Sequence, residues 1–258
     1  MTAGTACHEH ADFRALHASV DWGALSGSAS SLFESPEWFE NLALTCPVPG
    51  ALTRLLQVSS AEGVTVLPLR QRRDGTVESL SNYYAPVFGP ASTSTAAAVA
   101  HADALAQSLA SQRTSRLQLH PLDPTAPFWQ AFTQALQREG YWVGRYFTFG
   151  NWYHPCDGVS WAEYLGSRPS RLRHTILRSR RKLLADPRCT VRVLDASTPA
   201  DEASLAVADF ESVYARSWKK PEPHPLFVSS FCSMAHAQGW LRVGLCHLDG
   251  EPVAAQLW

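Results

Sequence analysis

The segment SWKKPEPHP, residues 217–225, carries the side chains best suited to proton transfer. Glu222 is the first candidate for a general base that would deprotonate an acceptor amine or hydroxyl, and His224 is the alternative. Trp218 and Lys219 stand just before them. Two simpler interpretations stay open. Proline-rich loops carry exposed glutamates for solubility, and lysines are favoured at the C-terminal end of a helix by its dipole.

The region 168–192 is strongly basic, with a single acid, Asp186. Apolar residues in this region and just before it follow helical spacing. They are Leu165, Leu172, Ile176 and Leu183. The arginines then occupy the other faces, and the candidate anion-binding residues are Arg171, Arg173, Arg178 and Arg181. The phosphate they would bind could belong to CoA, a nucleotide sugar, a lipid-linked substrate or RNA. The alternative is a solvated helix face whose charges pair with carboxylates elsewhere.

The segment SNYYAPVFGP, residues 81–90, brings two adjacent tyrosines before a proline. In a strand, Tyr83 and Tyr84 would face opposite sides, so one would pack in the core and the other would offer its hydroxyl to a cleft. Aromatic packing under a turn is the alternative. The cluster Cys7, His8 and His10 has no zinc-site spacing, and we expect it to be inert at a frayed terminus. No phosphate-binding glycine loop occurs, and we expect no metal.

The composition is that of an ordinary globular protein, with 45% hydrophobic and 17% charged residues. A formal net charge of -1 gives no sign of a polyanionic partner. The six cysteines are scattered, and neither a signal peptide nor an apolar run long enough to span a bilayer is visible. We therefore expect a cytoplasmic protein with reduced thiols, with a peripheral position at the inner membrane as a further option.

Within residues 1–150 the sequence predicts helices and a meander of β-strands. Helical residues 13–46, with Ser35 as a cap before Pro36, precede a β-hairpin of 52–59 and 64–70. A strand at 77–80, a helix at 92–110, a strand at 117–120 and a helix at 125–139 follow. The aromatic run 141–149 predicts a final strand.

Residues 151–258 repeat this theme. One long helix or two short ones cover 160–185, with Pro169 as a break. The strand 190–194, the helices 201–218 and 226–238, and a hairpin of 241–247 and 253–258 turning at Asp249-Gly250 follow. In the helix 201–218, the expected inward positions are Leu205, Ala208, Val213 and Trp218. The fold class is α/β with a mixed sheet, in two similar units.

Three segments carry a family resemblance. They are SLSNYYAPVFGP (79–90), the basic stretch 160–183, and YARSWKKPEPHPLFVSSF (214–231) with GWLRVGLCHLDGEPVAAQLW (239–258). In order and spacing they resemble the FemAB-like, BioF2-like acetyltransferases of the GNAT superfamily, especially members associated with exosortase and exopolysaccharide genes. The resemblance covers about residues 30–258.

The resemblance implies two tandem GNAT-like units, 1–150 and 151–258, with the second incomplete at residue 258. It implies transfer of an acyl group from acetyl-CoA or another acyl-CoA to an amine or hydroxyl of a sugar or cell-envelope precursor. The main elements binding acyl-CoA are expected beyond residue 258. The implied substrate-binding residues are Tyr83, Tyr84, Trp218, Lys219 and Gln256.

Two alternatives stay open. One is a FemAB-type transferase that takes amino acids from charged tRNA to peptidoglycan precursors, although the paired-helix arm of those enzymes is not visible. Nucleic acid is otherwise not expected as a partner. The other is a non-catalytic module that binds anions or glycans.

Overall fold

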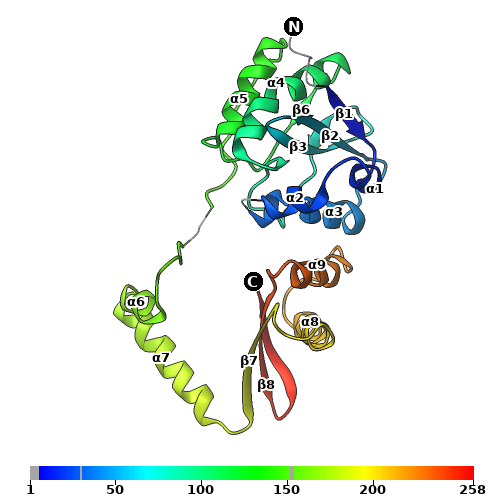
Figure 1. Ribbon diagram of the computed structural model, residues 1–258. Helices are drawn as coiled ribbons and strands as arrows, with labels where there is room; N and C mark the ends of the chain where they lie inside the picture. Colours follow the sequence, from blue (N-terminus) through cyan, green and yellow to red (C-terminus); the bar gives the residue numbers. More distant parts are fainter. Residues whose placement is uncertain (1–5, 30, 152–153) are drawn as a thin grey trace. The chain divides into compact units, whose positions relative to one another are not determined.

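The computed structural model describes residues 6–29, 31–151 and 154–258 (Figure 1). By its internal contacts the chain divides into two compact units, Met1–Gly150 and Asn151–Trp258. We call them unit 1 and unit 2 and describe each by itself.

Unit 1 is built on a six-stranded sheet. Its strands are β1 (Cys7–His10), β2 (Leu52–Ser60), β3 (Gly63–Gln71), β4 (Val77–Ser79), β5 (Ala91–Ser92) and β6 (Leu117–Gln118). The order is β1-β2-β3-β4-β6, and β5 pairs with β3 near the start of that strand. All pairs are antiparallel except β4 with β6, which is parallel. The predicted mixed α/β class is confirmed.

The predicted helical region 13–46 is four short helices rather than one. They are α1 (Phe13–His17), α2 (Trp22–Gly27), the 3-10 helix η1 (Leu32–Glu34) and α3 (Pro36–Thr45). Each starts at its own side-chain cap, because an Asp or Ser oxygen accepts a backbone N–H that the first turn leaves unpaired. The predicted start at Ser35 and Pro36 is confirmed: the Ser35 Oγ accepts from the Trp38 N–H at 3.2 Å.

The helices lie on both faces of this sheet. The helices α4 (Thr95–Ser111) and α5 (Pro127–Arg138) pack together on one face, and α1 to α3 lie on the other (Figure 1). Residues 54–58 of β2 are therefore buried on both sides. Ala97, Leu105 and Leu109 of α4 are fully buried, as their helical spacing predicts.

The predicted strand at 141–149 is wrong. These residues form no strand, and Trp142, Tyr146 and Phe147 are exposed. The aromatic composition favours a strand only where a neighbouring strand supplies hydrogen bonds and packing, and the sheet of unit 1 offers none here. The Tyr141 hydroxyl, which donates to the Thr114 carbonyl at 2.8 Å, holds the start of this segment.

The N-terminal residues Cys7–His10 are not frayed, contrary to expectation, because β1 pairs with β2. Its Glu9 carboxylate accepts two hydrogen bonds from the buried Arg54 guanidinium, at 2.6 and 2.9 Å. This hydrogen bonding from Arg54 lowers the pKa of Glu9 below its ordinary value.

A Glu9→Gln substitution should therefore destabilise unit 1 by about 0.5–1.5 kcal/mol near neutral pH, because Arg54 is buried but solvent partly screens the Glu9 carboxylate. Because the folded pKa is lowered, the contribution is present above the ordinary carboxyl pKa and is lost as the pH falls through the folded value. Urea unfolding of both proteins across the acid range measures the difference. A gap that persists unchanged at the acid end would contradict this assignment.

Unit 2 begins with two helices, α6 (Trp161–Gly166) and α7 (Ser170–Ala185), so the predicted break at Pro169 is confirmed. A three-stranded antiparallel sheet follows, of β7 (Cys189–Asp195), β8 (Arg242–Leu248) and β9 (Glu251–Leu257). Asp249 and Gly250 both have positive φ, 53° and 85°, which fits the predicted two-residue hairpin turn.

The helices α8 (Ala200–Ala215) and α9 (Phe227–Ala237) cover one face of this sheet (Figure 1). The core of unit 2 includes Leu194, Val207, Val243 and Leu245. Of the expected inward positions, Leu205, Ala208 and Trp218 are wrong, since all three are exposed, whereas Val213 is half-buried. The small residues Ala203 and Ala206 face the core instead, because they let the α8 backbone approach the sheet.

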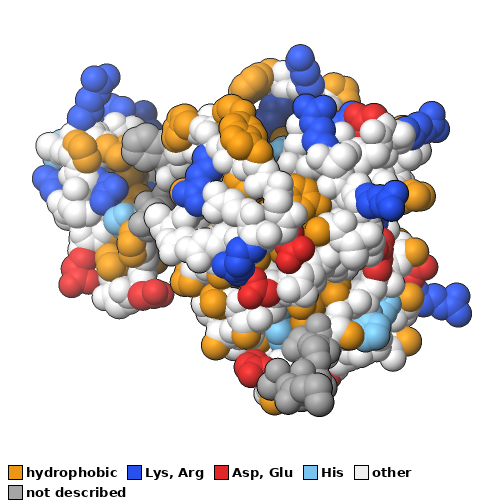
Figure 2. Space-filling model, turned by 90° about the horizontal axis from the view of Figure 1, so that it is seen from above, with side chains coloured by type: hydrophobic (Ala, Val, Ile, Leu, Met, Phe, Trp, Pro, Cys, Tyr) orange, Lys and Arg blue, Asp and Glu red, His pale blue; other side chains and the backbone are white. Residues whose placement is uncertain are grey.

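Figure 2 shows the surface from above. Basic side chains project singly, and hydrophobic side chains lie exposed between them. None of the helices in the described part of the chain combines the length and apolar character that a bilayer crossing requires.

Candidate functional site

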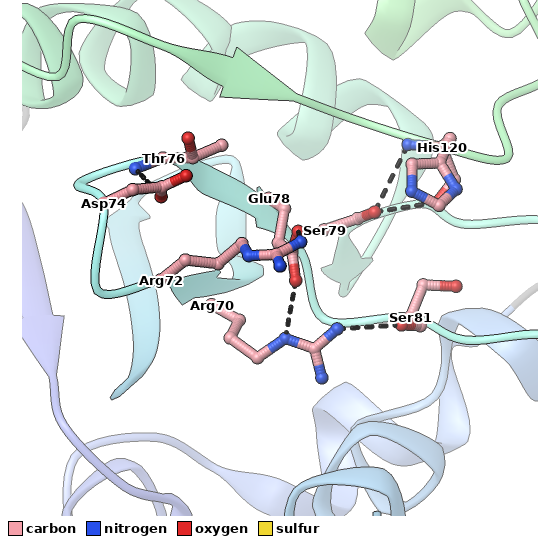
Figure 3. A network of polar contacts seen from close by, with 8 residues as sticks. All are labelled: Arg70, Arg72, Asp74, Thr76, Glu78, Ser79, Ser81 and His120. Atoms are coloured by element: carbon pink, nitrogen blue, oxygen red, sulfur yellow. Dashed lines mark hydrogen bonds and ion pairs between the residues drawn. The ribbon is translucent and has the colours of Figure 1, made fainter. Parts of the chain in front are cut away.

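In unit 1, the parallel strands β4 and β6 separate after two paired positions, Val77 with Leu117 and Glu78 with Gln118. Beyond them the Ser79 hydroxyl bridges the gap, donating to the His120 carbonyl at 2.7 Å and accepting from the His120 N–H at 3.2 Å (Figure 3).

An ion pair supports the β4 side of this gap. The Arg70 Nε donates to Glu78 at 2.9 Å, and the same guanidinium donates to the Ser81 carbonyl at 3.2 Å (Figure 3). Both charged side chains are largely buried. The pair therefore fixes the start of the segment 81–90 against β3 and β4.

The gap itself is filled by Phe88, which is 1% exposed. Its ring contacts Phe39 of α3 at a centroid distance of 5.7 Å and Trp129 of α5 at 5.8 Å. These helices lie on opposite faces of the sheet (Figure 1). The Phe88 ring contacts both of them, so it packs where the strands part. The Phe88 N–H donates to the Pro121 carbonyl at 2.7 Å, which ties the segment 81–90 to the chain after β6.

Tyr83 and Tyr84 lie in a turn of this segment and not in a strand. The rings are 4.3 Å apart and tilted, and the Tyr83 side chain is 65% exposed. Tyr84 is only half-buried, so the expectation that one tyrosine packs in the core is wrong, because a turn does not alternate its side chains as a strand does. The pair forms an aromatic surface at the edge of unit 1.

In unit 2, the segment 216–226 connects α8 to α9 and carries four of the predicted site residues. Glu222 and His224 are half-buried, whereas the prolines between and beside them are exposed. Trp218 is 93% exposed, and the Lys219 ammonium lies over the Tyr214 ring at 5.3 Å.

This segment lies at the end of the sheet where β8 turns into β9. The Arg216 guanidinium donates to the Pro252 carbonyl at 2.6 Å, and Pro252 pairs with His247 in the β8–β9 ladder. The irregularity between Cys246 and His247 falls at the same place. The start of the segment is thus fixed beside His247.

His247 and Asp209 form a pair that the sequence did not indicate. The His247 Nε2 lies 2.9 Å from Asp209 Oδ2, and both side chains are partly exposed, 19% and 38%. Asp209 comes from α8 and His247 from β8, on the face that α8 covers. A carboxylate that accepts from one ring nitrogen orients the imidazole and leaves the other nitrogen able to take a proton.

Gln256 lies elsewhere. Its neighbours Ala255 and Leu257 pack against the core under α8 and α9, so Gln256 points to the opposite face of the sheet. There it is paired with Gly244, over which the Trp258 ring lies. The structure therefore does not bring Gln256 together with the segment 216–226.

The predicted anion-binding arginines, Arg171, Arg173, Arg178 and Arg181, all lie on α7, and none of that helix is buried. Further along, Arg188 pairs with Asp186 and Arg192 pairs with Glu202. Within the described residues of unit 2, no basic side chain of α7 forms an ion pair. The alternative interpretation, in which the arginines pair with carboxylates elsewhere, is therefore supported only for Arg188 and Arg192, which follow α7.

Metal binding and nucleophilic attack by Cys232 find little support in the described residues. The described ranges contain no group of three or more His, Cys, Asp or Glu side chains placed to hold a metal. Burial raises the pKa of the Cys232 thiol to about 12, so this cysteine is not a nucleophile at neutral pH.

Comparison with known proteins locates the family relationship in unit 2. No curated protein and no solved structure matches the chain significantly. Residues 170–258, from the start of α7 to Trp258, match the family described as Acetyltransferase (GNAT) domain, so unit 2 carries a domain of GNAT type and acyl transfer is the activity that the match supports.

Proposed function

We propose that the chain acts in acyl transfer from acyl-CoA to an amine or hydroxyl of a sugar or cell-envelope precursor, in the manner of the FemAB-like, BioF2-like enzymes of exopolysaccharide synthesis. The observation that carries the proposal is the His247–Asp209 pair, which lies inside the matched domain and next to the segment 216–226.

In this proposal His247 is the general base. Asp209 accepts from Nε2, and Nδ1 would take the proton from the N–H or O–H of the acceptor. Glu222 and His224, both half-buried in the segment 216–226, are the other acid–base candidates. Trp218 and Lys219 offer an apolar surface and a cation to the acceptor, and Gln256 lines the opposite face of the sheet.

The residues described do not present a cleft for the pantetheine chain of acyl-CoA. GNAT domains bind acyl-CoA between parted strands, but β7, β8 and β9 of unit 2 stay paired as antiparallel neighbours, with one irregularity between Cys246 and His247. In unit 1 the parted strands are filled by Phe88. No step through the thioester is therefore assigned to residues of either unit.

We also propose that unit 1 is a second GNAT-like unit. The support is its antiparallel sheet with one parted parallel pair, β4 and β6, joined through α4. Because Phe88 fills the gap, unit 1 would contribute acceptor binding through Tyr83 and Tyr84 rather than acyl-CoA binding. A cytoplasmic location, peripheral at the inner membrane, fits such acceptors.

Release of free CoA thiol from acetyl-CoA tests this function in protein purified from its own cells. We expect release that depends on an added amino sugar or sugar nucleotide, because the proposed base acts on the acceptor. Thiol release at the same rate with and without every acceptor would contradict the proposal. Release that requires charged tRNA would favour the aminoacyl-transfer alternative.

A further inference from the structure

Helix α7 has two chemically different sides. The basic side consists of residues at positions i, i+3, i+7, i+10 and i+11, namely Arg171, His174, Arg178, Arg181 and Lys182. The apolar side consists of Leu172, Ile176, Leu177, Leu183 and Leu184. Arg173 and Arg180, seven residues apart, lie along the apolar side, where their long stems allow the charge to reach the surface.

Both sides are available. Leu172, Leu177 and Leu184 are 46%, 39% and 69% exposed. The only hydrogen bond of the α7 guanidinium groups in the described part of unit 2 joins Arg173 to the Gly166 carbonyl, at a long 3.5 Å. In Figure 1, α7 runs from α6 towards the start of β7, and most of its length lies apart from the three-stranded sheet.

The preceding helix adds an aromatic surface. Trp161 of α6 is exposed, and its ring stacks on Tyr164 at 5.7 Å. The Arg168 guanidinium lies over the same Tyr164 ring at 4.6 Å. Tryptophan and tyrosine next to cationic side chains are typical of surfaces that meet the boundary between lipid headgroups and acyl chains.

The combination of charge and exposed leucine narrows the class of partner. A nucleic acid or free phosphate would use the arginines and leave the leucines in water. A second copy of the chain would bring two uncompensated basic helices together, which like-charge repulsion disfavours. A bilayer with anionic headgroups accepts both sides at once, because phosphates bind the arginines and the headgroup boundary takes the leucines.

We propose that α6 and α7 form a docking surface for a membrane that contains anionic lipid. The helix would lie in the plane of the interface, with Leu172, Leu177 and Leu184 inserted and the basic side against the phosphates. This docking goes beyond acyl transfer and does not depend on it, because it can be measured without acyl donor or acceptor.

Sedimentation of the full chain with vesicles tests the proposal. Vesicles of phosphatidylcholine with phosphatidylglycerol should bind the protein at least about tenfold more tightly than phosphatidylcholine alone, with an affinity that falls as salt rises. The double variant Arg178→Gln, Arg181→Gln should lose about tenfold or more, and so should Leu177→Gln, Leu184→Gln. Arg188→Gln, which removes a charge already paired with Asp186, is the matched control and should bind within about twofold of wild type.

Three outcomes would overturn the proposal. The first is no preference for anionic vesicles. The second is binding that the arginine variant loses and the leucine variant keeps, with displacement by a soluble polyanion such as polyphosphate, because that identifies a polyanion site. The third is a leucine variant with a lowered melting temperature and unchanged vesicle binding, which would place these leucines against the exposed Val191 and Val193 of the sheet. None of these three outcomes depends on acyl transfer, so a failure of the proposed acyl-transfer function would be recognised separately, in the thiol-release assay.

Discussion

His247→Gln should lower the acceptor-dependent rate of acyl transfer by about 10²–10⁴-fold, the contribution of a positioned general base. The substitution keeps a polar side chain that can still donate to Asp209 but removes the nitrogen that would take the acceptor proton. Asp209→Asn should also lower the rate, because the amide no longer orients the imidazole as a carboxylate does. Steady-state rates of thiol release, with and without acceptor, measure both effects.

Two controls separate this assignment from its rivals. His236→Gln changes a histidine of the same unit whose Nε2 lies 2.8 Å from the Thr198 carbonyl, and its rate should stay near wild type. Glu222→Gln tests the base that the sequence indicated first. A large loss in Glu222→Gln together with an unchanged rate in His247→Gln would move the base to the segment 216–226 and contradict the His247 assignment.

Phe88→Ala should lower the free energy of unfolding of unit 1 by about 3–5 kcal/mol, the range for removing a buried aromatic ring from a packed core. The loss should be near the upper end because Phe88 contacts residues from both faces of the sheet, Phe39 and Trp129. Urea unfolding of the full chain, followed by circular dichroism, measures the change.

Tyr83→Ala is the matched control, since this aromatic residue lies in the same segment but is mostly exposed. Its free energy of unfolding should stay within about 1 kcal/mol of wild type. If Phe88→Ala cost no more than Tyr83→Ala, the parted strands of unit 1 would not be filled as described.

Local signals predicted most of the fold. Ser35 with Pro36 marks a helix start, and Asp249 with Gly250 marks a hairpin turn, because each effect lies within a few residues of sequence. The strand predicted at 141–149 failed because strand formation depends on a partner that local composition does not reveal. The inward side of α8 was predicted wrongly. Leu205 is more hydrophobic than Ala206, but the close approach of α8 to the sheet leaves room only for the smaller side chain, so Ala206 is buried and Leu205 is exposed.

Prediction of the candidate site from the sequence was limited in the same way, by contacts between residues far apart in the chain. Glu222 and His224 could be proposed from the composition of one short segment, and both are half-buried there. The His247–Asp209 pair joins residues 38 positions apart, so no spacing rule indicated it. One signal was present: His247 follows Val243 and Leu245 at alternate positions of a strand, which places a histidine on the core-facing side.

Transfer of label from radioactive acetyl-CoA to an amino sugar or envelope precursor is the most direct test of the proposed function. It should be run side by side on wild type, His247→Gln and Glu222→Gln, with protein purified from its own cells. We predict labelled acceptor with wild type, near-complete loss with His247→Gln, and a smaller effect with Glu222→Gln. Labelled acceptor at the wild-type rate from His247→Gln, or no labelled acceptor from wild type with any amine or hydroxyl offered, would contradict the account.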